Sequence, residues 1–141
     1  MKIKSILQPL DLVVVKAEYG EGKRAGWLTS FTLACRHGKE LLEVGKVSTG
    51  VKEKAEGLTY KEMTAMLKPL ILEQKGKEVV VKPKIVLEVA YEEIQKSPSY
   101  SSGYALRFPR VLRSRVEEKG VEDINTLKNV EKIYSSQRGK K

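Results

Sequence analysis

The 141-residue sequence contains little cysteine and no long apolar run, and each shortage excludes a class of protein. Cys35 is the only cysteine, so an internal disulfide and a cysteine-rich metal site are both impossible, and a reducing compartment is the simpler interpretation. The apolar residues near the N-terminus are interrupted by Gln8, Pro9 and Asp11, which excludes a signal peptide. No stretch has the length and hydrophobicity of a membrane span. We therefore expect an intracellular, cytoplasmic protein without a membrane partner.

Aromatic and metal-binding side chains are also scarce. Aromatic residues make up 6% of the chain, and we interpret Trp27, Phe31 and Tyr100 as core residues rather than base-stacking groups. The single histidine, His37, precedes Gly38 in an expected turn and has no ligand partner nearby in the sequence. We predict no metal site in this chain.

Positive charge is what the sequence has in excess. Lysine and arginine together number 27 against 18 aspartate and glutamate residues, which gives a net charge of +9 at pH 7. A polyanion such as nucleic acid is the natural partner, although a lysine-rich surface also serves solubility. With 40% hydrophobic residues over this length, the chain can form one domain with a sizeable core.

The order of apolar and polar residues predicts a mainly β domain. Five stretches have the composition of strands: 10–19, 27–36, 41–48, 79–91 with a break at Pro83, and 105–116. The glycine-rich segment 20–26 joins the first two as a hairpin loop, and 97–103 is a loop by composition. We predict that the first three strands form an antiparallel meander.

Two helices are predicted beside the strands. Thr59 can cap a helix whose apolar residues, from Met63 to Ile71, recur at helical spacing. Asp123 can cap a second helix that carries apolar residues from Ile124 to Tyr134. Three strands, a helix and two further strands is the order of the OB-fold. We therefore predict a five-stranded Greek-key OB-fold barrel with one helix between strands three and four and a C-terminal helix.

Arginine is concentrated in one segment, 107–115, which holds four of the seven arginines although lysine outnumbers arginine 20 to 7 overall. The planar guanidinium fork binds two phosphate oxygens at once, so this concentration favours geometry-specific phosphate recognition. In an extended stretch Arg113 and Arg115 share a face. Pro109 has no N–H and indicates a bend or sheet edge that redirects the arginines on either side. The alternative is an edge strand decorated with solubilising charge.

The same segment resembles motif VI of ATP-dependent DNA ligases, because Arg107-Phe108-Pro109-Arg110 reproduces its R-F-P-R element. Further blocks at 10–34 and at 82–100 are similar to the OB domain of these enzymes in order and spacing. Lys2-Ile3-Lys4 resembles the K-x-K of motif V, which in the family lies at the edge of the nucleotidyltransferase domain. The chain is thus similar to the C-terminal OB-fold domain of archaeal and eukaryotic ligases, beginning at motif V.

The resemblance divides the chain into three parts and assigns roles to individual residues. Residues 1–8 are expected to be a remnant of motif V and its linker, 9–120 the OB-fold domain, and 121–141 a C-terminal helix and basic tail. The roles implied are nucleotide phosphate binding by Lys2 and Lys4, assistance of adenylation by Arg107, Arg110, Arg115 and Lys119, and DNA binding by Lys23, Arg24, Val111 and Arg113. Eukaryotic relatives place an aromatic residue at the position of Val111 and use it to open the minor groove, so we expect any wedge function here to be weaker.

What the resemblance implies for catalysis is limited by what the chain lacks. The family joins AMP to the lysine of a K-x-D-G motif, whereas Asp11 and Asp123, the only aspartates, do not precede glycine. No nucleophilic lysine can be assigned and no carboxylate cluster is a candidate for Mg²⁺, so the isolated chain is predicted to be inactive. ATP and Mg²⁺ are expected only in the complete enzyme, where motif VI would stabilise negative charge on the departing pyrophosphate.

The resemblance also implies partners. Nicked double-stranded DNA and the ligase nucleotidyltransferase domain are expected, for a monomer that acts in DNA replication, repair and recombination, in the nucleus if the source is eukaryotic. Two alternatives remain: a free-standing basic OB-fold module that binds single-stranded DNA or RNA, and the OB domain of an RNA ligase or capping enzyme. The arginine cluster with Pro109 favours the DNA ligase, because non-specific strand binders depend on stacked aromatic residues.

Overall fold

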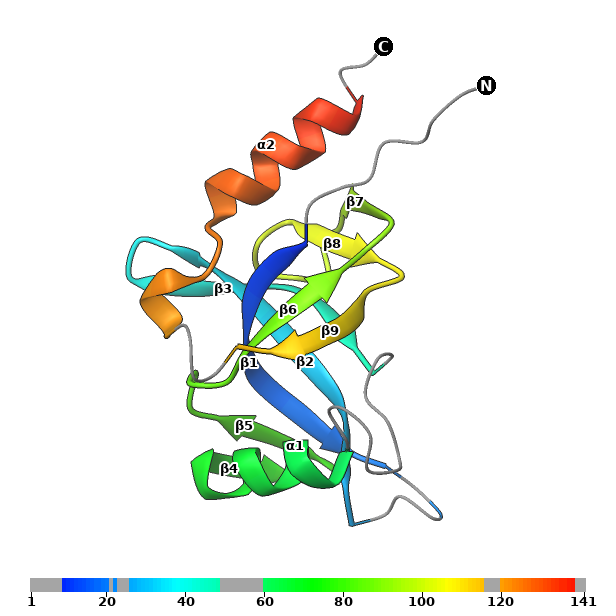
Figure 1. Cartoon of the computed structure of the whole chain (residues 1–141), viewed down its shortest axis with the longest axis vertical. Helices are drawn as coiled ribbons and strands as arrows, with labels where there is room; N and C mark the ends of the chain where they lie inside the picture. The colour runs from blue at the N-terminus through cyan, green and yellow to red at the C-terminus, as the bar shows by residue number, and fades with distance from the viewer. Residues whose placement is uncertain (1–8, 21, 23–25, 49–59, 116–119, 139–141) are drawn as a thin grey trace.

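The computed structural model of the chain describes residues 9–20, 22, 26–48, 60–115 and 120–138. Within these ranges it consists of strands, two α-helices and two short 3₁₀ helices (Figure 1). In chain order the elements are β1 (Leu10–Tyr19), β2 (Leu28–His37), β3 (Glu40–Val47), α1 (Tyr60–Leu67), η2 (Lys68–Leu70), β4 (Ile71–Lys75), β5 (Glu78–Val81), β6 (Val86–Ala90), β7 (Glu93–Lys96), β8 (Tyr104–Arg107), β9 (Arg110–Ser114), η3 (Val121–Asp123) and α2 (Leu127–Arg138). None of the helices described is long and apolar enough to cross a membrane.

Strand β1 organises the main sheet because it pairs with three other strands. Along one edge it runs antiparallel to β2. Along its other edge the first half, Leu10–Val13, pairs with β6, and the second half, Lys16–Glu18, pairs with β5. The register with β2 shifts between Val14 and Lys16, so that Val15 forms a β-bulge. A bulge bends a strand and increases its twist. The bend allows β1 to pair with β6 along its first half and with β5 along its second half.

The strands confirm the mainly β, OB-type architecture, but the barrel is open. Strands β1, β2 and β3 form the predicted antiparallel meander, and β9 continues the sheet beyond β6. Among the described residues β3 and β9 do not pair with each other, so the predicted closure is not seen. The loop between β7 and β8 lies against β3 instead: the Ser102 N–H donates to the Glu43 carbonyl over 3.2 Å, and the Glu43 N–H donates to Ser101 Oγ over 2.8 Å.

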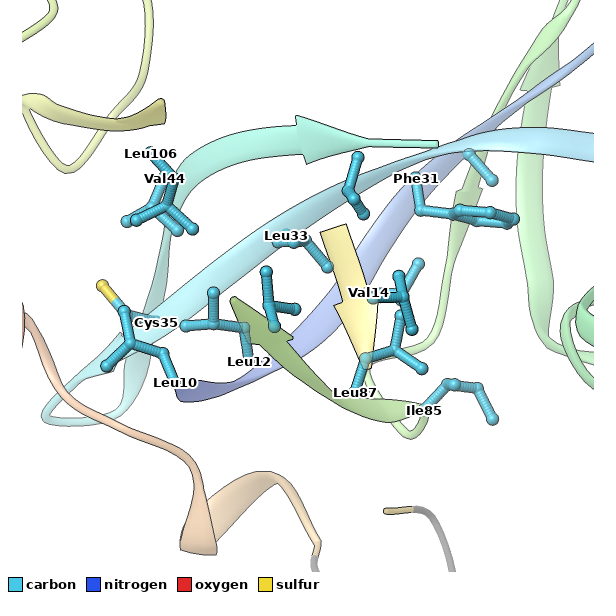
Figure 2. Packing of buried hydrophobic residues seen from close by; sticks show 14 of the residues in the cluster. Leu10, Leu12, Val14, Phe31, Leu33, Cys35, Val44, Ile85, Leu87 and Leu106 are labelled. Carbon is cyan, nitrogen blue, oxygen red and sulfur yellow. The ribbon is translucent and has the colours of Figure 1, made fainter. Parts of the chain in front are cut away.

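The main core lies between the curved strands and takes alternate residues from each of them. Figure 2 shows the side chains of β1, β2, β3 and β6 pointing toward one another; they include Leu10, Leu12, Val14, Phe31, Leu33, Val44 and Leu87. Each fully buried side chain of this size contributes about 1.5–3 kcal/mol to folding. Phe31 is completely buried, which confirms its interpretation as a core residue. Cys35 also lies in this core, and burial raises its pKa to about 11.

A second, smaller cluster covers the opposite face of the same strands and fixes the segment before α2. Val13, Ala34 and Val86 pack there against Ile124. The next residue, Asn125, holds two strand ends: its N–H donates to the Asp11 carbonyl over 2.9 Å, its Oδ1 accepts the Asp11 N–H at 2.7 Å, and its carbonyl accepts the Arg36 N–H at 3.0 Å. The backbone of Asn125 thus acts as a short piece of strand between β1 and β2.

Both predicted helices exist, but their ends differ from the sequence expectation. The first was expected to continue to Ile71, whereas α1 ends at Leu67 and Ile71 begins β4. Pro69 follows in η2, and a residue before proline is disfavoured in α-helical conformation. The second helix is not capped by Asp123, which lies in η3 and accepts the Gly120 N–H at 3.1 Å.

Thr126 begins the second helix instead. Thr126 Oγ1 accepts the Asn129 N–H at 3.3 Å, and Asn129 Oδ1 accepts the Thr126 N–H at 2.9 Å, which is a reciprocal capping arrangement. Helix α2 therefore starts at Leu127, and Ile124 stays outside it in the small cluster.

Replacing Asn125 is expected to weaken the fold as a whole. Asn125→Ala leaves the Asp11 N–H without its side-chain acceptor, and the free energy of unfolding should fall by about 1–2 kcal/mol. Urea denaturation followed by circular dichroism measures this change. Gln74→Ala is the control, because Gln74 is exposed and its side chain bonds, among the described residues, only to the Gly76 carbonyl. Equal midpoints for the two variants would contradict the structural role of Asn125.

The burial of Cys35 predicts a loss of stability at alkaline pH. The thiol ionises near 9.0 when exposed and near 11 in the fold, so the unfolded state loses its proton first and stability falls as pH rises from about 9 to 11. The free energy of unfolding of the wild type should therefore decrease more steeply over this interval than that of Cys35→Ala, by up to about 3 kcal/mol in total. Parallel curves for the two proteins would show that burial does not hold the thiol neutral.

Candidate nucleic-acid interface

The R-F-P-R residues form the junction between two sheets. Arg107 ends β8, where it lies opposite Glu93 of β7, and Arg110 begins β9, where it lies opposite Ala90 of β6. Between them Phe108 has a φ of 51°, in the left-handed region, and Pro109 supplies no N–H. The expectation of one extended stretch over 105–116 was therefore wrong, whereas the prediction that Pro109 marks a bend is confirmed.

Arg107 is held in place at the surface by a carboxylate and a ring. Its Nη1 lies 3.1 Å from Glu93 Oε2, and its guanidinium carbon lies 5.1 Å from the centre of the Phe108 ring. The side chain is about half exposed, so the ion pair contributes little to stability, on the order of 0–1 kcal/mol. The charge of Arg107 is therefore oriented without being buried.

Arg113 and Arg115 share one carboxylate oxygen. Glu88 Oε1 lies 2.7 Å from Arg113 Nε and 3.5 Å from Arg115 Nη1, which confirms that the two arginines lie on the same face. Leu112 forms a bulge in β9, since Glu88 pairs with Arg113 whereas its neighbour Val89 pairs with Val111. Arg113 is 56% exposed and Arg115 only 16%, so Arg113 is the member of the pair that can reach a partner molecule.

Arg110 differs from the other three arginines. It is exposed at the start of β9, and in the described part of the chain its guanidinium takes part in no ion pair or hydrogen bond. A guanidinium carries five N–H donors and is not deprotonated in proteins. Within the described part of the chain, all five N–H donors of the Arg110 guanidinium are therefore available to bind an anion. Arg110 lies between Arg107 and Arg113 in the sequence, and the pairing of β9 with β6 fixes its backbone.

The remaining residues assigned by resemblance are buried or lie outside the described ranges. Val111 is 4% exposed and belongs to the main core, so the structure does not present its side chain at the surface. Lys2, Lys4, Lys23, Arg24 and Lys119 lie outside the described residues. The described base of the β1–β2 hairpin is closed by the Gly20 N–H, which donates to the Trp27 carbonyl over 2.9 Å.

Three residues of the site were not identified from the sequence. Glu88 and Glu93 orient three of the four arginines, and Phe108 is exposed although it is aromatic. The signal for Phe108 was its place before Pro109, since that position restricts the backbone. The glutamates gave no local signal, because their partners depend on strand register.

The described residues do not contain a metal centre. No group of three or more histidine, cysteine, aspartate or glutamate side chains within them is placed to hold a metal ion. The arrangement of 107–115 can instead bind oxyanions, since exposed guanidinium groups stand on two strands whose backbones are fixed by sheet pairing.

Similarity to known proteins extends over the arginine segment. The family model for the C-terminal region of ATP-dependent DNA ligase matches residues 24–118, which include the whole arginine segment. The DNA ligase of Nanoarchaeum equitans is 56% identical over 99% of this chain, and that of Archaeoglobus fulgidus is 53% identical over 97%. The chain spans 25% and 24% of these two relatives, about a quarter of their length.

Solved structures support the fold. The ligase domain of M. tuberculosis LigD matches 82% of this chain with a TM-score of 0.65 and 22% identity, and the match covers 37% of that chain. A mycobacterial DNA ligase D complexed with ATP and MES matches 84% with a TM-score of 0.61 and 21% identity, again over 37% of that chain. With the family match and the sequence relatives, the resemblance seen in motif VI is confirmed: this chain belongs to the family of C-terminal regions of ATP-dependent DNA ligases.

Proposed function

We propose that this chain is the OB domain of an ATP-dependent DNA ligase and that its exposed arginines bind the phosphates of nicked duplex DNA and of the nucleotide. The observation that carries the proposal is Arg110, whose guanidinium is exposed and unoccupied within the described ranges while its neighbours are oriented by carboxylates. The net charge of +9 favours a polyanionic partner. The enzyme relatives support a ligase over a free-standing module.

In adenylation the proposed task of this chain is to stabilise charge. ATP supplies the adenylyl group in the complete enzyme, and Arg107 and Arg110 would hold oxygens of its outer phosphates, where negative charge accumulates. Arg115 would contribute chiefly through Glu88, because it is mostly covered. Lys119 and the motif V lysines Lys2 and Lys4 belong to the same proposed phosphate site. No group of acidic, histidine or cysteine side chains among the described residues is placed to hold Mg²⁺.

In DNA binding the proposed contacts are Arg110 and Arg113, with Lys23 and Arg24 on the hairpin loop. These side chains would contact the backbone of duplex DNA, which fixes position rather than sequence. The partners are nicked duplex DNA and a nucleotidyltransferase domain, and the protein would act inside the cell, as a monomer, in DNA replication, repair and recombination. Val111 is left out of this contact set because its side chain is in the core.

A free-standing single-strand binder is less well supported. Such proteins line a groove with aromatic residues, whereas Phe31 is fully buried and Trp27 packs partly buried against the main core. Preference for nicked duplex over single strands would favour the ligase function.

Nick sealing in trans tests the proposed function directly. The 141-residue chain is mixed with a ligase catalytic fragment that lacks its OB domain, ATP, Mg²⁺ and a nicked duplex. Joining should be restored, and Arg110→Ala should reduce it by at least about 10-fold, the effect of about 1.4 kcal/mol of lost charge stabilisation. Lys75→Ala is the matched control, since it removes one exposed positive charge on β4. Failure to restore joining, with tighter binding to single strands than to nicked duplex, would contradict the proposal.

The carboxylates that hold the arginines should tune affinity for DNA. Glu88→Gln removes the negative charge beside Arg113 and Arg115, so duplex affinity should rise several-fold, and the log–log salt slope, expected to be about −3 to −4 for the wild type, should steepen by up to about 0.9. Anisotropy titrations at several salt concentrations measure both quantities. Glu73→Gln, on exposed β4, makes the same change in net charge. If it raises affinity equally, the effect belongs to overall charge and not to the release of the arginines.

A further inference from the structure

Arg107 lies on a part of the domain that is separate from the main sheet. Strands β7 and β8 pair with each other in a two-stranded sheet, whereas Arg110 and Arg113 stand on β9, which pairs with β6 of the main sheet. A two-stranded hairpin is only marginally stable by itself in water. The direction in which Arg107 points therefore depends on the contacts that hold the β7–β8 hairpin against the rest of the domain.

The two faces of this hairpin have different surroundings. Side chains alternate along a strand, so Leu106 and Arg107 of β8 point to opposite faces. Leu106 and its partner Ile94 on β7 are buried in the main core. A Cβ on Gly45 of β3 would lie 3.6 Å from the Leu106 backbone nitrogen, which shows how closely β8 approaches β3. The inner face of the hairpin is thus attached to the domain, and Arg107 stands on the outer face with Glu93.

One residue of α2 holds the loop end of the hairpin. Lys96 and Tyr104 are paired directly across β7 and β8. The Tyr134 ring lies against both: its centre is 5.2 Å from the centre of the Tyr104 ring, with the planes tilted by 59°, and 5.9 Å from Lys96 Nζ. Tilted aromatic pairs attract each other, and so do a cation and a ring face. Since Val130 fixes α2 in the main core, Tyr134 joins the hairpin to an anchored helix.

Other contacts keep the hairpin attached when this one is lost. The loop between β7 and β8 is bonded to Glu43 of β3 through Ser101 and Ser102, and Leu106 remains in the core. Removal of the Tyr134 ring should therefore loosen the hairpin without detaching it. The expected consequence is that Arg107 spends less time in its native orientation.

We propose that Tyr134 is a positioning residue for Arg107, because it holds the β7–β8 hairpin against α2 and thereby fixes the orientation of the Arg107 guanidinium relative to Arg110. This inference rests on the proposed function and adds to it a residue that acts through Arg107 and touches neither DNA nor nucleotide. Adenylation, which uses Arg107, depends on Tyr134. Duplex binding by Arg110 and Arg113 does not, since both stand on the main sheet.

Adenylation of a ligase catalytic fragment by ATP, with the 141-residue chain added in trans, tests this inference. Tyr134→Ala should slow adenylation by about 2- to 12-fold, the factor expected for loss of one aromatic pair. Tyr134→Phe keeps the ring and should restore the wild-type rate. Affinity for duplex DNA, measured by anisotropy, should be the same for the wild type and both variants.

A double-mutant cycle identifies the residue through which Tyr134 acts. When Arg107→Ala is already present, Tyr134→Ala should have almost no further effect on the adenylation rate. When Arg110→Ala is present, Tyr134→Ala should slow adenylation by its full factor. The NMR signal of the Arg107 Nε–H group gives a readout without catalysis: it should shift or broaden in Tyr134→Ala and return to its wild-type position in Tyr134→Phe.

Met66→Ala is the matched control for a general loss of stability. Met66 is partly buried and packs against the main core from α1, at the opposite end of the domain from α2 (Figure 1). This variant should unfold at a lower temperature than the wild type and should adenylate at the wild-type rate wherever its fold is intact.

Several results would overturn the inference. If Met66→Ala slows adenylation as much as Tyr134→Ala, the tyrosine matters only for stability. If the effects of Tyr134→Ala and Arg107→Ala multiply, Tyr134 acts independently of Arg107. In both cases the proposed function stands. If Arg107→Ala and Arg110→Ala adenylate as fast as the wild type, or if the wild-type chain does not accelerate adenylation, the proposed role in adenylation is wrong and this inference is wrong with it.

Discussion

The pairing of β1 with β2, β5 and β6 is the interaction on which the rest of the structure depends. One ten-residue strand supplies a row of core side chains and hydrogen bonds to two strands on one edge and one on the other. The bulge at Val15 makes this possible, because it bends β1 where the partner changes from β6 to β5. Since β6 in turn carries β9, the positions of Arg110 and Arg113 follow from how β1 is bent.

The arginine segment has its properties because it crosses between two sheets. Residues within one strand would alternate between core and solvent, and half of a cluster would be buried. Here the left-handed Phe108 and the bulge at Leu112 interrupt that alternation, so that Phe108, Arg110, Leu112 and Arg113 are all exposed. Glu88 and Glu93 orient Arg107, Arg113 and Arg115, whereas the guanidinium of Arg110 takes part in no ion pair or hydrogen bond within the described ranges.

Local patterns were sufficient for most of the fold and for the arginines. The stretch 10–19 was predicted from its β-branched run, and the following two strands were placed to within one residue of β2 and β3 at each end. Strand β4 was missed because Ile71 continues a helical spacing of apolar residues, although Pro69 was a local warning. Asp123 and Thr126 are both plausible caps, and only the bonds from Asn125 to β1 and β2 decide between them. The burial of Val111 and the partners of the arginines depend on register, which one strand alone does not specify.

Asn125 is also one of two connections through which mechanical load would pass between the sheet and α2. It joins the first residues of β1 to the last residues of β2 and stands one residue before the capping pair of α2. Helix α2 is joined to the rest of the domain in a second way, since Val130 lies in the main core and the Tyr134 ring lies 5.2 Å from that of Tyr104 on β8. A force applied between the start of β1 and α2 is therefore shared between the hydrogen bonds of Asn125 and the apolar contacts of the helix.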